Sequence, residues 1–260
     1  MPEAEGIHYE TAGGEHLPPL ILSSGLGGSC GYWTPNIAAL AEHFHVISYD
    51  HRGTGHSDRT PEPSTSVEAM AADVAMLIDR FELERASVIG HALGAMVGLE
   101  LALSSDRIDK LVAVNGWATL DPHTRRCFET RLDLLRHAGA EAFVRAQPLF
   151  LYPPDWISAH DAELTDEARR HLGAFPGAPT VEARIAAVQS WQPALDRRST
   201  SARCLVIGTR DDFLVPVARS RELAEALPGA QYHQFDWGGH ACNVTDPCTF
   251  NRIVIDFLRS

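Results

Sequence analysis

Two neighbouring aspartates and a later histidine carry the side chains best suited to acid–base chemistry. Asp211 and Asp212 lie in GTRDDFLVP (208–216), and His240 lies in GGHACN (238–243). An imidazole titrates near neutral pH and can move protons, and a carboxylate beside it fixes its tautomer. Counting back from the proline of the first motif favours Asp212 as the partner, whereas counting forward from its first glycine favours Asp211. We predict a pair of His240 and Asp212, with Asp211 as the alternative.

A second pattern, GHALG (90–94), lies between a predicted strand and a predicted helix. It matches the nucleophile-elbow pattern G-x-S-x-G everywhere except at the serine, where this chain has Ala92. A methyl group cannot attack a carbonyl, so a covalent acyl-enzyme is excluded at this position. Loss of such a serine lowers kcat by about 10⁶, and the remaining groups still give roughly 10³–10⁴ over water. We interpret His91 as a residue packed behind the site rather than as a base.

The segment SSGLGGS (23–29) follows a predicted strand and supplies candidate hydrogen-bond donors. A glycine-rich turn there can point backbone N–H groups at a developing oxyanion, and the N–H that follows the nucleophile position does the same. We therefore predict the N–H groups of Leu26 and Leu93 as oxyanion donors. The Ser24 hydroxyl either touches substrate or bonds its own loop, and the sequence leaves both interpretations open.

The middle of the chain offers further candidates for substrate binding. Arg125 lies in HTRRCF (123–128), and its guanidinium has the fork geometry that suits a carboxylate, although a solvated helix face is the commoner interpretation. Trp117 is expected either to line a pocket or to pack in a core. Cys30 or Cys242 could act as a substitute thiol nucleophile, but small buried cysteines without such a role are common.

Strand-like and helix-like segments alternate on both sides of this middle region. That alternation predicts a mostly parallel, doubly wound sheet, and elbow, acid and histidine follow one another in the order of an α/β-hydrolase. Residues 1–116 and 202–260 are predicted to form this core. Residues 117–201 are helical and rich in proline, and we predict that they form a helical cap over the carboxyl edge of the sheet, where ligands bind in such folds.

Composition narrows the classes of partner. The 260 residues carry a formal net charge of −12, which argues against nucleic acid and against anionic membranes as partners. Thirteen histidines include no HExxH, and the glycine-rich segment lacks the third glycine of a dinucleotide loop, so no metal and no cofactor is predicted. Five cysteines without a CxxC pair and a start without an apolar segment predict a reduced, cytoplasmic protein. A small-molecule substrate is expected, and a homodimer is the most common state for such proteins.

Several motifs together resemble one bacterial family, the pyrimidine-utilisation protein D (RutD) family of α/β-hydrolases. They are SGLGGSCGYW, YDHRGTG, IGHALGAMVGLELAL, VNGW, HTRRCF, AQPLFLYPPDW and GGHACNVTDP, and the likeness runs from about residue 20 to 258. That family also has alanine in GHALG. The resemblance implies hydrolysis of a small product of uracil degradation, with carbamate and 3-aminoacrylate as the proposed substrates. Both compounds also decay spontaneously, which agrees with a site that lacks a nucleophile.

Three hypotheses on function follow from the sequence. The first is a hydrolase of a C–N bond in which His240, oriented by an aspartate, activates water. The second is a binding module that sequesters a metabolite without turnover, and it is motivated by the missing nucleophile. The third is a serine hydrolase whose elbow serine was replaced by Ala92.

Overall fold

Eight strands form one sheet at the centre of the protein. The computed structural model describes residues 3–59 and 65–260. The strand order is β1-β2-β4-β3-β5-β6-β7-β8, and pairing is parallel from β4 through β3 to β8 and antiparallel where β2 meets β1 and β4. The strands are β1 (Glu3–Ala4), β2 (Ile7–Ala12), β3 (Pro19–Ser23), β4 (His45–Tyr49), β5 (Ala86–His91), β6 (Ile108–Val114), β7 (Arg203–Thr209) and β8 (Gln231–Phe235).

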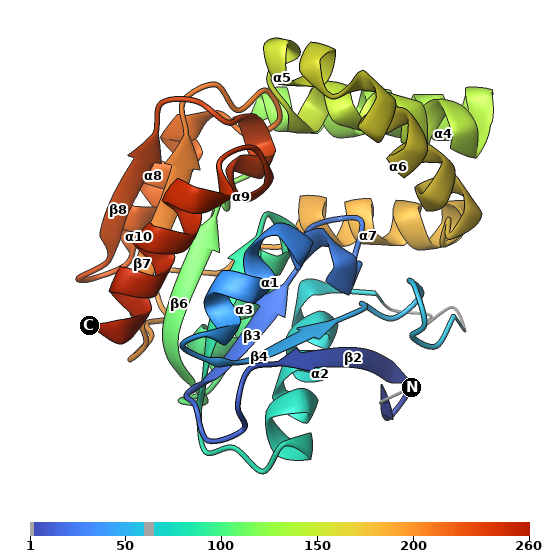
Figure 1. Ribbon diagram of the computed structural model, residues 1–260. Coiled ribbons are helices and arrows are strands. Elements are labelled where there is room, and N and C mark those ends of the chain that lie inside the picture. Colours follow the sequence, from blue (N-terminus) through green and yellow to red (C-terminus); the bar gives the residue numbers. More distant parts are fainter. Residues whose placement is uncertain (1–2, 60–64) are drawn as a thin grey trace.

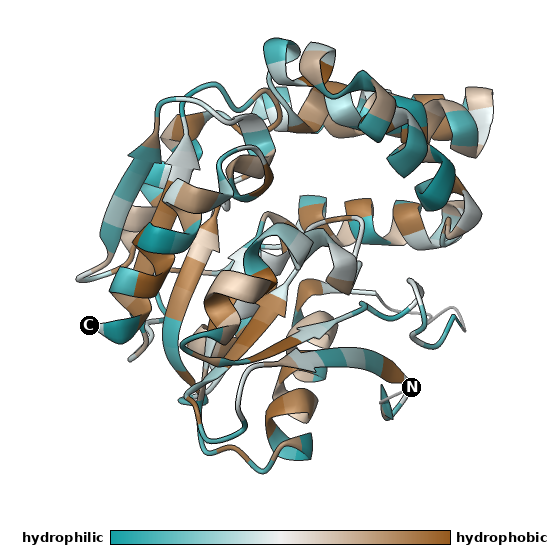
Figure 2. Ribbon diagram, in the orientation of Figure 1, coloured by the Kyte–Doolittle hydropathy of each residue, from teal (hydrophilic) through white to brown (hydrophobic). Residues whose placement is uncertain are grey.

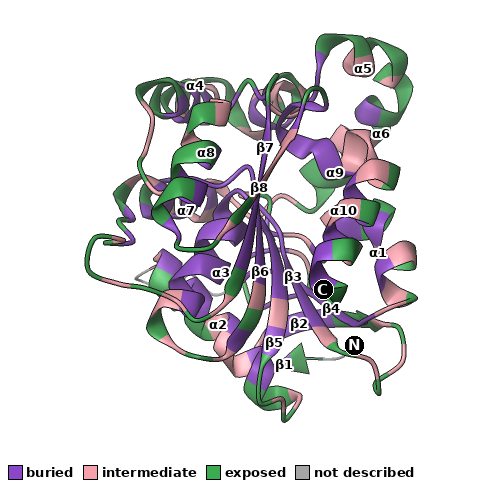
Figure 3. Ribbon diagram, turned by 90° about the vertical axis from the view of Figure 1, so that its left-hand side faces the viewer, coloured by how far each residue is buried: buried purple, intermediate pink, exposed green. Residues whose placement is uncertain are grey.

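The central strands are buried because helices cover both faces of the sheet. Strands buried on both faces read as continuous apolar runs rather than as alternating patterns. Leu20, Ile21 and Leu22 on β3 and Val88 and Ile89 on β5 are fully buried in this way. Figure 2 shows hydrophobic residues concentrated on these strands and on the helices beside them. Figure 3 shows the strands as a buried layer between helices whose outer sides are exposed.

Helices pack on both faces of the sheet, which confirms the predicted doubly wound fold class. One face carries α1 (Thr34–Ala41) and α10 (Pro247–Arg259). The other carries α2 (Val67–Arg80), α3 (Leu93–Ser104) and α8 (Val217–Ala226). Among the helices of the described residues, none has both the length and the hydropathy that a membrane span requires.

Local sequence explains where these helices begin. The side chain of Ser66 accepts the N–H of Ala69, and this hydrogen bond satisfies one of the free donors of the first turn of α2. Asp246 accepts the N–H of Thr249 in the same way and starts α10. The start of α3 differs, because the residue before it, Ala92, has no side-chain acceptor. Its first N–H groups therefore remain available to other partners.

Four helices between β6 and β7 leave the sheet, and we call them the cap. They are α4 (Pro122–Leu151), α5 (Pro154–Ala159), α6 (Asp161–Gly173) and α7 (Ala178–Ser190). Figure 1 shows α4, α5 and α6 beyond the carboxyl ends of the strands, with α7 running back beside the core. Helix α4 is interrupted at Gly139, whose φ of 83° lies in the left-handed region that favours glycine. The break divides α4 into two arms.

Candidate active site

A histidine and an aspartate are paired in the loops that follow β7 and β8. The Nδ1 atom of His240 lies 2.7 Å from Oδ2 of Asp212. The other carboxylate oxygen, Oδ1, accepts the backbone N–H groups of Leu214 at 2.8 Å and Val215 at 2.9 Å. His240 is 1% exposed and Asp212 is 9% exposed, so water competes little for this pair. A carboxylate fixed on both oxygens holds the imidazole in one orientation and directs its Nε2 away from the acid.

Asp211, the alternative acid, has a different task. Its two carboxylate oxygens accept the backbone N–H groups of Gly238 at 3.3 Å and Gly239 at 2.9 Å. These glycines open the short helix η2 (Gly239–Ala241), which carries His240. Asp212 therefore contacts the imidazole ring, whereas Asp211 holds the loop that presents the ring.

The turn between β5 and α3 has a strained backbone and carries Ala92 at its tip. Ala92 has φ 50° and ψ −108°, and such a conformation costs about 1–3 kcal/mol for a residue other than glycine. Both flanking glycines are needed. A Cβ atom at Gly90 would lie 2.2 Å from the carbonyl oxygen of Gly94, and one at Gly94 would lie 2.1 Å from that of Ser23. The strained turn is thus kept although its side chain is a methyl group.

His91 fixes the backbone of His240 rather than reacting itself. Its Nε2 donates to the carbonyl oxygen of His240 at 2.8 Å, and Nδ2 of Asn115 donates to the same oxygen at 2.7 Å. The His91 ring meets the His240 ring edge-on, with centroids 4.7 Å apart, and stacks on Tyr32. Burial, and after it the neighbouring His240, holds the pKa of His91 well below its usual value. His91 is a neutral ring that positions His240 and brings the elbow and the histidine together.

Arg184 of the cap helix α7 holds the loop that follows β3. The residue is 1% exposed. Its Nη1 donates to the carbonyl oxygens of Leu26 at 3.1 Å and Gly27 at 3.4 Å. Its Nη2 donates to the carbonyl oxygen of Arg52 at 2.7 Å and to the hydroxyl of Thr54 at 2.6 Å. One cap side chain therefore ties together two loops at the carboxyl edge of the core.

Sequence reasoning missed Arg184, yet the helical periodicity held a signal. Val181, Arg184, Ile185 and Val188 recur at steps of three and four, so they share one face of α7. Three apolar members of that face predict a buried fourth. An arginine at such a position needs acceptors inside the protein, because a buried charge without partners is costly.

The predicted oxyanion donors lie in two separate segments beside the elbow. Leu93 is the first residue of α3, where N–H groups have no partner within the helix. Leu26 lies in the loop that Arg184 holds. Ser24, at the start of that loop, is 1% exposed, and its hydroxyl has no hydrogen-bond partner among residues 3–59 and 65–260. The Ser24 side chain does not bond its own loop, which leaves its hydroxyl available to a ligand.

The remaining candidates occupy different environments. Trp117 is buried, and its ring centroid lies 6.4 Å from that of Phe128 on α4. Arg125 is exposed on α4 and thus faces solvent. Burial is the first cause that raises the pKa of Cys30 and of Cys242, each to about 12. Both thiols are therefore neutral at pH 7, and neutral thiols are poor nucleophiles.

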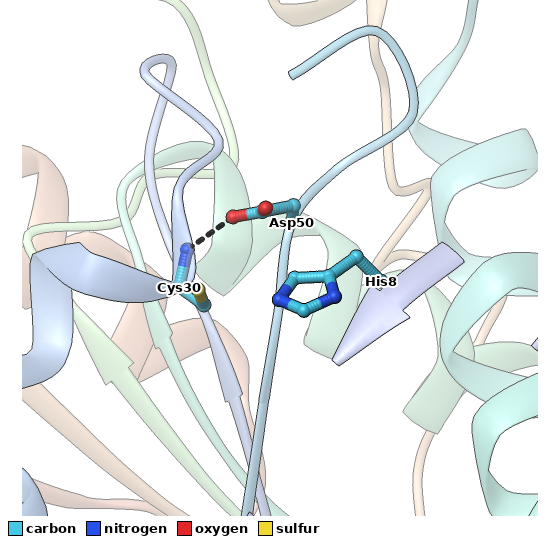
Figure 4. A group of neighbouring side chains, drawn as sticks. All are labelled: His8, Cys30 and Asp50. Carbon is cyan, nitrogen blue, oxygen red and sulfur yellow. Dashed lines mark hydrogen bonds between the residues drawn. The ribbon is translucent and has the colours of Figure 1, made fainter. Parts of the chain in front are cut away.

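A second cluster of titratable side chains contains neither His240 nor Asp212. Figure 4 shows His8, Cys30 and Asp50 gathered at the end of β4. The Asp50 carboxylate accepts the backbone N–H of Cys30 at 2.8 Å through one oxygen and that of His56 at 2.9 Å through the other. Because the carboxylate is already engaged and the Cys30 thiol is neutral, we assign this cluster to holding the turn after β4.

The comparisons with known proteins agree with this architecture. Residues 18–247 match the alpha/beta hydrolase fold family. The crystal structure of the enol-lactonase from Burkholderia xenovorans LB400 superposes with a TM-score of 0.88 at 28% identity, covering 99% of this chain and 98% of that one. Fold and site thus define an α/β hydrolase.

Two curated relatives define the family more narrowly. A protein of Caulobacter vibrioides is 46% identical over 257 residues, which is 98% of this chain and 96% of that protein. A protein of Agrobacterium fabrum is 42% identical over 255 residues, with 97% and 98% covered. Both carry the name "Putative carbamate hydrolase RutD". The chain belongs to the RutD family of α/β hydrolases.

Proposed function

We propose that this protein hydrolyses a C–N bond in a small product of uracil degradation, with carbamate or 3-aminoacrylate as the substrate. The names of its relatives support a carbamate hydrolase, and the RutD resemblance supports the pathway. The single observation that carries the mechanism is the pairing of His240 with Asp212 beside an elbow that presents Ala92. The base of a triad is retained where the nucleophile is missing.

In this mechanism, Nε2 of His240 takes a proton from a water molecule as the water oxygen bonds to the substrate carbon. Asp212 accepts the Nδ1–H bond throughout and stabilises the imidazolium that forms. The N–H groups of Leu26 and Leu93 bind the oxygen on which negative charge develops. The proton then passes from His240 to the leaving nitrogen, the C–N bond breaks, and ammonia is released. No covalent intermediate with the protein forms.

The rate acceleration that His240 could supply is sufficient for a substrate that is already labile. General acid–base catalysis by one positioned imidazole contributes about 10²–10⁴. A stable amide would need a far larger factor, since complete enzymes reach 10⁶ and beyond. Carbamate and 3-aminoacrylate both decay without a catalyst, so a modest acceleration is sufficient for either.

A different class of function, sequestration of a metabolite without turnover, is favoured by one observation, the methyl group of Ala92 at the attack position. The two functions are separated by following ammonia release from carbamate and from freshly generated 3-aminoacrylate at substrate concentrations far above that of the protein. The proposal expects many turnovers per molecule at a rate above that of buffer alone. Release equal to that of buffer for both compounds, with binding still seen by calorimetry, would establish sequestration instead.

A further inference from the structure

Arg131, on the first arm of α4, is a buried cation whose Nε–H has no partner among the described residues. The residue is 4% exposed. Its Nη2 donates to Oε1 of Gln147 at 2.6 Å, and its Nε is buried without a hydrogen-bond partner among the described residues. Among residues 3–59 and 65–260, no carboxylate lies within ion-pair distance of the Arg131 guanidinium. A guanidinium carries five N–H donors, and an unpaired buried one is costly.

Aromatic rings surround this cation. The guanidinium carbon of Arg131 lies 5.4 Å from the ring centroid of Phe143, 5.5 Å from that of Phe150 and 5.8 Å from that of Phe128. Ring faces attract a cation but accept no proper hydrogen bonds, so they stabilise the charge of Arg131 without giving its Nε–H an acceptor. Burial lowers the pKa of Arg131 to about 10, and the group therefore keeps its charge at neutral pH.

The cation lies on the side of the cap that meets the loop of the catalytic acid. Cys127, one helical turn before Arg131, lies with its Sγ 4.0 Å from the carbonyl oxygen of Phe213, the residue after Asp212. The ring of Phe150 lies 6.1 Å from the ring of Phe213. Burial is the main cause that raises the pKa of the Cys127 thiol, and the charges of Arg131 and Asp212 then act on it in opposite directions. Both charges are thus close to the same side chain.

We propose that Arg131 is the anion-binding group of this site and that the substrate is a small carboxylate, which the guanidinium holds while the C–N bond meets His240. The inference rests on the proposed function, whose two candidate substrates both carry a carboxylate, and it assigns the residue that binds this group. A carboxylate supplies the two acceptor oxygens that match the guanidinium fork, and it supplies the counter-charge that Arg131 lacks among the described residues. Arg125, the arginine suggested by the sequence, is exposed, so the buried arginine of the same helix takes this role.

Binding of propionate and of its neutral counterpart propionamide tests the proposal without any turnover. We expect wild-type protein to bind propionate at least tenfold more tightly than propionamide in an NMR titration. Arg131→Met should weaken propionate binding at least tenfold and leave propionamide binding unchanged. Arg145→Met removes an exposed arginine of the same helix and should bind propionate like the wild type. Equal binding of the two ligands by the wild type would overturn the proposal.

Gln147→Glu provides a second test of propionate binding at Arg131, which serves if Arg131→Met fails to fold. It places a carboxylate where the amide now accepts from Arg131, so it supplies the missing counter-charge from within the protein. We expect the variant to keep or raise its Tm and to lose propionate binding at least tenfold. Propionate binding at the wild-type level in Gln147→Glu would contradict an anion site at Arg131.

His240→Ala separates this inference from the proposed function. We expect the variant to bind propionate as the wild type does, because the anion site lies on the cap rather than on the imidazole. If wild-type turnover does not exceed that of buffer but propionate binding depends on Arg131, the hydrolase proposal fails and the anion site remains. If turnover depends on His240 but propionate binding ignores Arg131, the anion site fails and the hydrolase proposal remains.

Discussion

Two regions of the site differ in which members of a triad they supply. One is the elbow, the turn that carries Ala92, and the other is the acid–histidine corner, the loops that carry Asp212 and His240. In the loops that carry Asp212 and His240, two members of a triad are paired, since His240 bonds Asp212 at 2.7 Å and two backbone N–H groups fix that carboxylate. At the elbow, the strained backbone is present but Ala92 supplies no nucleophile. The difference shows that the surroundings of a reacting atom and the attacking group are separable. A site can have a histidine paired with an acid, and a strained turn, without a residue that could form a covalent bond to a substrate.

Ala92→Ser tests whether the elbow still holds its tip residue in line with His240. The hydroxyl would stand on a turn that already has the geometry of a nucleophile elbow, with His240 available as base. We expect labelling by a fluorophosphonate to rise from none to near one equivalent, measured by intact mass. The double variant Ala92→Ser/His240→Ala should stay unlabelled. An inert serine variant would mean that elbow and histidine are not aligned, and it would also count against a serine hydrolase whose nucleophile was replaced.

Asp212→Asn tests the corner itself. An amide that donates to Nδ1 imposes the wrong tautomer on His240, so the catalytic contribution of the ring should fall by about 10²-fold or more. Asp211→Ala is the matched comparison, because Asp211 bonds only the loop glycines. We expect it to lower Tm and to reduce the rate less than tenfold. Steady-state ammonia release measures the rate of each variant. Equal losses of rate in Asp212→Asn and Asp211→Ala would contradict the different roles assigned to the two aspartates.

Arg184→Met tests how much the cap stabilises the loop that follows β3. The change leaves three backbone carbonyl groups and one hydroxyl without their cationic donor. We expect the free energy of unfolding to fall by about 1–3 kcal/mol or more, because a buried acceptor left without a partner carries a desolvation cost of that size. Urea denaturation checks this, and the exposed Arg145→Met should change it by about 0.5 kcal/mol or less. An unchanged free energy of unfolding in Arg184→Met would show that the cap does not stabilise the loop.

The smallest expected effect is on the pH dependence of stability. Burial lowers the pKa of His51 to about 3, and burial also lowers that of His91, whereas an unfolded histidine titrates near 6.5. The unfolded chain then binds more protons, so stability is full above pH 6.5 and is lost as the pH falls toward the folded values. Each ring should contribute about 1–2 kcal/mol of loss between pH 6.5 and 5. His51→Phe should remove one such contribution, and an unchanged pH slope in urea titrations would refute the assignment.

The local parts of the site could be predicted from the sequence, and the parts made by distant contacts could not. GHALG and the loops around His240 follow strands, and short segments of this kind set their own turns. Two adjacent aspartates are different, because a shift of one residue exchanges their roles and only the folded loop selects between them. Arg184 reaches acceptors 130 to 158 residues away in the chain, and no local pattern names such partners.

Arg131 is a second buried arginine whose burial the sequence predicts but whose partners it does not. Its position among Phe128 and Leu135 on one face of α4 predicts burial by periodicity alone. What periodicity cannot predict is whether a buried arginine finds acceptors for both of its terminal nitrogens, as Arg184 does, or leaves its buried Nε without a partner, as Arg131 does. That depends on how the second arm of α4 folds back at Gly139. Helical periodicity places both arginines on buried faces, and only the packing shows which acceptors each of them meets.

The rate of ammonia release by His240→Ala, compared with the wild type and with buffer, measures whether the imidazole takes part in breaking the C–N bond. We expect the wild type to exceed buffer and His240→Ala to lose about 10²–10⁴ of that acceleration while keeping its Tm within a few degrees. A folded His240→Ala variant that releases ammonia as fast as the wild type would contradict it, because the imidazole would then have no part in breaking the C–N bond.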